Sequence, residues 1–82
     1  MDAFDLYIKV VNNRKNLSDV EIAEICEQIR SATGDRAYTI YLARQDGWWT
    51  SDNATTCEEI RKAPGDCAIA ITLAKMCGWW VG

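Results

Sequence analysis

The chain contains one segment twice. Residues 26–51 and 57–82 align without a gap at an offset of 31 positions, and 14 of the 26 aligned pairs are identical. Unrelated segments of average composition would share about one or two. Each copy begins with Cys-Glu-x-Ile-Arg, passes through Gly-Asp and contains Gly-Trp-Trp near its end. Any fold assigned to these 82 residues, which we treat as a single domain, must therefore place two equivalent units in it.

The repeat decides how two ambiguous segments are interpreted. Taken alone, residues 66–78 are consistent with an Ala-rich helix that has an Asp cap and a terminal Gly. The equivalent segment, 36–43, is rich in β-branched and aromatic residues, which favour strands. Both segments also alternate larger with smaller side chains, which is the strand period. We therefore predict strands at 37–44 and 67–74.

Two helices and further strands complete the expected order. A capping box that starts at Ser18 marks the first helix, and Pro64 followed by Gly65 ends the second. The prediction in chain order is strand 4–11, helix 18–33, strand 37–44, strand 47–51, helix 56–63, strand 67–74 and a short strand 78–81. This βαββαβ order with related halves predicts an α+β fold, a ferredoxin-like two-layer sandwich with an internal αββ duplication. A tandem αββ sheet is the alternative.

In such a sandwich the larger apolar side chains face the helices: Leu6, Ile8, Val10, Tyr38, Ile40, Leu42, Ile69, Ile71 and Leu73. The opposite sheet face carries Tyr7, Lys9 and Tyr41 among small residues. A bare, nearly uncharged face of this kind indicates a binding surface for a partner. Scattered surface apolar residues are the alternative explanation.

The two Trp pairs and one helix face are further candidates for partner binding. Trp is enriched at interface hot spots, so outward rings among Trp48, Trp49, Trp79 and Trp80 are candidate anchors. Core packing is the competing interpretation of the same four rings. The first helix also shows an acidic side, which could dock a basic partner or be an ordinary solvated face. Its carboxylates are those of Glu21, Glu24 and Glu27.

No motif for catalysis or for a cofactor is present. Histidine is absent, which removes the commonest general base and the usual activator of a nucleophilic Ser or Cys. The four cysteines lack the short spacing of zinc ligands, and we expect no metal site. Free thiols are the expected state, although a Cys57–Cys77 disulfide is geometrically possible in the predicted fold. We therefore expect a protein that is not an enzyme.

Charge and hydropathy restrict the possible partners. The formal net charge is −3, which disfavours direct binding to nucleic acid. The chain begins without a basic region followed by an apolar run, so we expect no secretory signal and a cytoplasmic protein. No apolar stretch is long enough to span a bilayer. Another protein is the expected partner, and the chain is expected to be a monomer or a homodimer.

The leading functional hypothesis is a small non-catalytic module that binds another protein. Small acidic proteins of this kind include phage-encoded inhibitors of host defence or nucleic-acid-handling complexes, anti-CRISPR proteins among them. One alternative is single-stranded nucleic-acid binding on the sheet, with Tyr7 and Tyr41 as stacking platforms. A ligand-sensing regulatory domain of similar topology is another.

Overall fold

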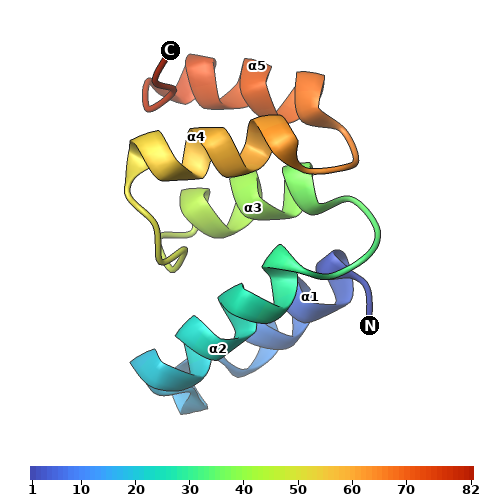
Figure 1. The fold of residues 1–82 in the computed structure, drawn as a ribbon. Coiled ribbons are helices and arrows are strands. Elements are labelled where there is room, and N and C mark those ends of the chain that lie inside the picture. Colours follow the sequence, from blue (N-terminus) through green and yellow to red (C-terminus); the bar gives the residue numbers. More distant parts are fainter.

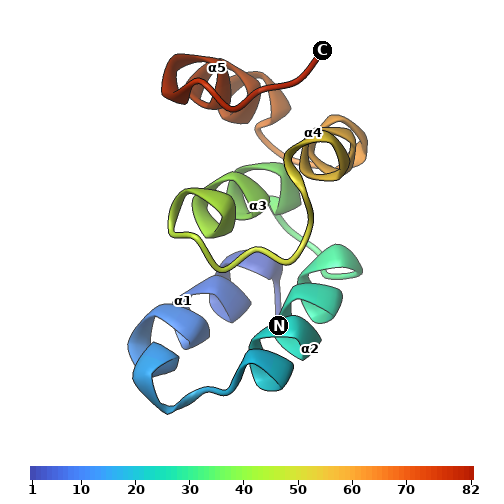
Figure 2. The same cartoon turned by 90° about the vertical axis from the view of Figure 1, so that its left-hand side faces the viewer.

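A computed structural model describes all 82 residues as five helices in two layers. Helices α1 (Ala3–Asn13), α3 (Arg36–Gln45) and α5 (Cys67–Cys77) form one layer, and α2 (Asp19–Arg30) and α4 (Asn53–Lys62) form the other (Figures 1 and 2). A single 3₁₀ turn, Arg14–Asn16, follows α1. Because α3 packs against every other helix, it occupies the centre of the chain.

Each repeat copy is a helical hairpin followed by an extended tail. The first copy comprises the end of α2, then α3 and the tail that holds Trp48. The second comprises the end of α4, then α5 and the tail that holds Trp79. Helix α1 occupies the position of the second helix of a hairpin. The same contact links successive units, because Ala3 N–H donates to Thr33 O at 2.8 Å and Ala37 N–H donates to Pro64 O at 3.1 Å.

The predicted ferredoxin-like sandwich is wrong. The chain has no sheet, and the segments predicted as strands 4–11, 37–44 and 67–74 are the helices α1, α3 and α5. Residues 47–51 and 78–81 lie outside helices but pair with no strand, so the tandem αββ sheet is wrong as well. Both predicted helices exist, with the first somewhat shorter than expected at 19–30 and the second starting earlier, at residue 53.

Local hydrogen bonding explains why the alternating segments are helical. Asp35 caps α3 by accepting the N–H of Tyr38 at 3.0 Å, and Asp2 caps α1 in the same way. Gly78 ends α5 in the left-handed region, where a glycine is favoured. The residues of α3 that are buried follow the helical period as closely as the strand period, so the apparent alternation carried little information. They are Ala37, Thr39, Ile40, Tyr41 and Ala43.

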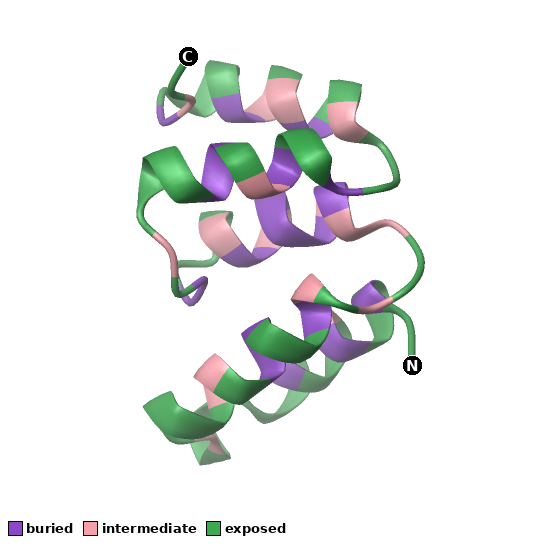
Figure 3. Cartoon of the chain, viewed as in Figure 1, coloured by how far each residue is buried: buried purple, intermediate pink, exposed green.

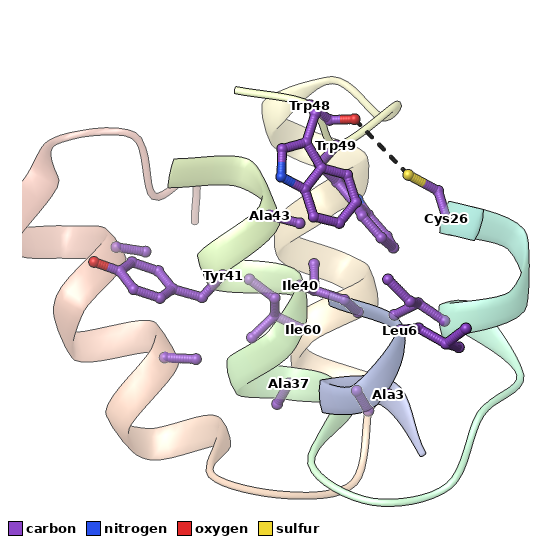
Figure 4. Packing of buried hydrophobic residues seen from close by; sticks show 14 of the residues in the cluster. Ala3, Leu6, Cys26, Ala37, Ile40, Tyr41, Ala43, Trp48, Trp49 and Ile60 are labelled. Carbon is purple, nitrogen blue, oxygen red and sulfur yellow. Dashed lines mark hydrogen bonds between the residues drawn. The ribbon is translucent and has the colours of Figure 1, made fainter. Parts of the chain in front are cut away.

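The core fills the space between the two helix layers and includes the first Trp pair. Eighteen buried apolar residues form one cluster, to which all five helices contribute. Trp48 and Trp49 both lie inside it, and the Cys26 thiol donates to Trp48 O at 3.8 Å (Figure 4). The predicted core set was partly wrong. Leu6, Val10 and Ile40 are buried, whereas Ile8 and Ile69 are 38% and 52% exposed.

The link between units provides a stability test at Gly65. This residue has φ +109°, and a Cβ there would overlap the Asp35 carboxylate. Gly47 has a similar positive φ, +87°, but nothing lies within 4 Å of the position of its Cβ. We expect Gly47→Ala to lose about 1 kcal/mol of unfolding free energy through backbone strain alone, and Gly65→Ala to lose clearly more. Urea unfolding measures both values, and equal losses would contradict the close approach of Gly65 to Asp35.

Candidate functional site: the exposed face of α1, α3 and α5

A stack of aromatic rings occurs twice, once at each contact between successive units. Phe4 stacks on Tyr7 with a ring separation of 5.8 Å, and Tyr7 stacks on Trp48 at 5.9 Å. On the next helix, Tyr38 stacks on Tyr41 and Tyr41 on Trp79, each at 6.0 Å. Each tail therefore places one indole on the second helix of the unit before it. This repeated contact sets the relative rotation of α1 and α3.

Because the two stacks are equivalent, corresponding positions of the helices face the same way. Residues four and three positions apart lie on one side of a helix, and each of the three helices has such a stripe away from the core. We call the surface they form the odd-helix face. Its members are Phe4, Ile8 and Val11 on α1, Tyr38 and Leu42 on α3, and Ile69, Leu73 and Met76 on α5.

The odd-helix face is apolar and accessible. Five of its side chains are exposed, from 38% for Ile8 to 78% for Met76, and the other three are half-buried. No ionisable residue belongs to it apart from the phenol of Tyr38. Figure 2 shows the three helices side by side in one layer. Eight apolar side chains on three packed helices make a larger patch than scattered surface residues would, and this makes the odd-helix face the candidate site.

The second residue of each Trp pair makes a cation–π contact with an arginine. The Arg30 guanidinium lies 4.5 Å from the Trp49 ring centroid, and Arg61 lies 4.8 Å from that of Trp80. Glu59 joins the first pair to α4, since its carboxylate accepts from Arg30 Nε at 2.5 Å and from Trp49 Nε1 at 3.3 Å. These contacts hold the tails against the first helices of the hairpins.

Trp48, Trp49 and Trp79, predicted as partner-binding anchors, are buried at 5–7% exposure, and Trp80 is half-buried. Their contacts are those of packing residues, the interpretation that competed with the anchor hypothesis. Tyr41 is buried at 7% exposure. Its hydrogen bond with the Cys77 thiol and its burial raise the pKa of its hydroxyl.

The remaining predicted site residues lie apart from one another. Lys9 is exposed on α1, off the odd-helix face. Glu21, Glu24 and Glu27 are all exposed on α2. Glu21 completes the capping box, and the hydrogen bond from Ser18 N–H lowers its pKa. Glu27 forms an ion pair with Arg30, which leaves Glu24 as the one carboxylate of the three without an ion pair or cap.

Sequence reasoning missed most of the odd-helix face. The signal was present in the spacing of residues 4, 8 and 11 and of residues 69, 73 and 76, which is helical. Under the strand interpretation, Ile8, Leu42, Ile69 and Leu73 pointed into the core, so the stripe was divided between two faces.

The chain offers no obvious site for a metal or for a membrane span. No three His, Cys, Asp or Glu side chains cluster closely enough to hold a metal ion. All four cysteines are free thiols. None of the helices combines the length and apolar composition needed to cross a bilayer.

The fold and the candidate site define a short two-layer array of helical hairpins. Searches of protein-family models, of curated proteins and of solved structures found no match to this chain.

The Tyr7 hydroxyl gives a pH-dependent test of the first aromatic stack. It donates to Asp46 Oδ2 at 2.6 Å, and burial together with this carboxylate raises the pKa of Tyr7 to about 12. A raised tyrosine pKa contributes stability below the unfolded value of about 10, and this contribution is lost as the pH rises through 12. We expect Tyr7→Phe to cost about 1 kcal/mol at pH 7, with the difference shrinking above pH 10.

Urea unfolding of wild type and Tyr7→Phe between pH 7 and pH 11 measures this effect. Tyr38→Phe is the matched control, because the Tyr38 hydroxyl makes no hydrogen bond within the chain, and it should unfold like the wild type. A Tyr7→Phe penalty that stays constant with pH would contradict the assignment.

Proposed function

We propose that this protein is a non-catalytic binding module that holds a segment of another protein on the odd-helix face. The observation that carries the proposal is the alignment of eight apolar side chains on the solvent side of three packed helices. Monomeric proteins rarely leave such a surface uncovered, because each exposed apolar area costs free energy in water.

The shape of the face favours a helical ligand. The helices α1, α3 and α5 lie side by side in one layer (Figure 2). Side chains on the surface of packed helices generally form ridges with grooves between them. An amphipathic helix fits a groove of this kind with apolar residues at positions i, i+3 or i+4, and i+7. Phe4 and Tyr38 supply the aromatic contacts that often dominate such interfaces.

The overall charge of the chain is consistent with a protein partner. The chain is mildly acidic, with a net charge of −3, and the face itself contains no cation. Binding of a nucleic-acid strand would need a basic surface and accessible stacking rings. Tyr41, one of the two proposed stacking platforms, is buried, and Tyr7 is partly covered by Phe4 and Trp48. No observation therefore favours that alternative.

The proposal extends to the setting in which the module acts. Four free thiols suit the reducing cytoplasm, where we place the protein. Its size, its acidity and the absence of histidine fit an inhibitor that blocks a surface of a larger complex. A phage-encoded inhibitor of a host defence or nucleic-acid-handling complex, such as an anti-CRISPR protein, is the specific form we propose for it.

A peptide selection tests the binding face directly. We would select ligands for the wild-type protein from a displayed library of random peptides and measure their affinities by calorimetry. The expected ligands carry apolar residues at helical spacing. Ile8→Glu places a charge in the centre of the α1 stripe and should weaken their binding at least about tenfold.

Val20→Glu is the matched control for this experiment. Val20 is a β-branched residue that is 68% exposed in the first turn of α2, away from the odd-helix face. The control should bind like the wild type, and circular dichroism should show that both variants remain folded. Ligands that bind Ile8→Glu as tightly as the wild type would refute the proposed face.

A further inference from the structure

Helix α5 lacks a cover that the two equivalent helices have. The unit that follows α1 and the unit that follows α3 cover Ala3 and Ala37 completely, and both residues are 0% exposed. Each of these alanines donates its N–H to a carbonyl in the following link. On α5 the equivalent residue is Ala68, which is exposed and makes no such hydrogen bond.

The side chains on this side of α5 leave a hollow. Thr72 is equivalent to Tyr7 and Tyr41, the residues on which the indoles of Trp48 and Trp79 stack, and it is exposed. Ile69 likewise replaces an aromatic ring. The hollow has a volume of about 250 Å³ and is lined by Ala68, Ile69, Thr72 and Leu73. Figure 3 shows exposed and half-buried segments along the free edge of α5.

We propose that a second copy of this chain covers the hollow, so that two α5 helices pack antiparallel about a twofold axis. The same side of α1 and of α3 is covered by helical units of this protein, and a helix of a second copy would cover the equivalent side of α5. The dimer contact differs from the internal one, because two α5 helices meet in it and no tail indole takes part. A symmetric pair also closes on itself, which limits the assembly to a dimer.

The residue pattern of α5 is self-complementary in this arrangement. With the axis between residues 70 and 71, Ala68 lies opposite the partner's Leu73, and Ile69 lies opposite the partner's Thr72. Each larger side chain therefore meets a smaller one, as close helix packing requires. Ile69 and Leu73 then bury apolar surface that is exposed or half-buried in the single chain.

Charge favours the antiparallel direction. Lys75 in the last turn of α5 is exposed and forms no ion pair within the chain. Asp66 precedes the other end of α5 and makes no side-chain capping bond there, and a hydrogen bond with Asp35 and its negative charge raise the pKa of Asp66. The antiparallel pair places Asp66 near the partner's Lys75 and supplies the cation that this acidic end lacks. A parallel pair would instead bring like charges together.

The dimer goes beyond the proposed function and also changes its geometry. It covers Ile69 and Leu73, so the odd-helix face that stays free for a ligand consists of its members on α1 and α3 together with Met76. A twofold axis perpendicular to the helix layers keeps the odd-helix faces of both copies on the same side. The three helices of each copy then form one layer of six. Because only one helix from each copy makes the contact, we expect a total buried area below about 1,200 Å² and a weak dimer in exchange with the monomer.

Analytical ultracentrifugation of the full chain at concentrations up to about 1 mM tests the proposal. We expect a monomer–dimer equilibrium for the wild type. Ala68→Glu should raise the dissociation constant at least about tenfold, because it places a charge against the apolar side chain of the partner's Leu73. The substitution should not unfold the chain, since Ala68 is exposed in the first turn of α5, where a negative charge is favoured.

Ala54→Glu is the matched control, because Ala54 is an exposed alanine at the second position of α4. It should dimerise like the wild type. Lys75→Glu should also weaken the dimer and make it less sensitive to salt. A wild-type chain that stays monomeric throughout, or a dimer unaffected by Ala68→Glu, would overturn the proposal. Because no peptide ligand is involved, failure here leaves the test of the odd-helix face independent.

Discussion

The contact on which the rest of the structure depends is the packing of each tail indole on the second helix of the unit before it. Trp48 lies on Tyr7 and Trp79 lies on Tyr41 at nearly the same ring separation. The second indole of each tail is held by an arginine at the end of a first helix. The Gly-Trp-Trp motif therefore makes two contacts, one with the preceding unit through its first indole and one with a first helix through its second. Large aromatic rings suit this role because they bury much surface with few torsions.

This contact explains why the repeat was visible and the fold was not. Cys, Ile, Arg, Gly and Trp recur at 31 residues because each occupies an equivalent place in a link or a core, so the sequence was sufficient to define the units. The type of the second element was mistaken, since Tyr38, Ile40 and Leu42 alternate as a strand does. What decides the helix is the capping of the chain by Asp35 and the burial of Ala37, Ile40 and Ala43 on one side. Strand propensity is weaker than such tertiary context.

Recognition of the candidate binding surface also depended on whether these segments were assigned as strands or as helices. Once residues 4–11 and 67–74 are helices, Ile8 and Ile69 leave the core and join a stripe that a strand would divide between two faces. The tryptophans change in the opposite direction, from candidate surface anchors to packing residues. Three of the four rings are buried at the contacts within and between units. The absence of histidine, in contrast, is independent of the fold, and it removes the commonest general base under the strand and the helix interpretation alike.

A stack of like units always ends in surfaces that its own interior would have covered. On α5 the side that following units cover on α1 and α3 is exposed at Ala68 and Thr72. On α5 the two positions that hold aromatic rings in the earlier stacks are occupied by Ile69 and Thr72, so an incoming indole would lose its ring partners there. The substitution removes the aromatic link while it keeps an apolar, small-and-large pattern. That change is what a helix needs in order to pack against another helix rather than against a Gly-Trp-Trp tail, and it favours a second α5 as the cover.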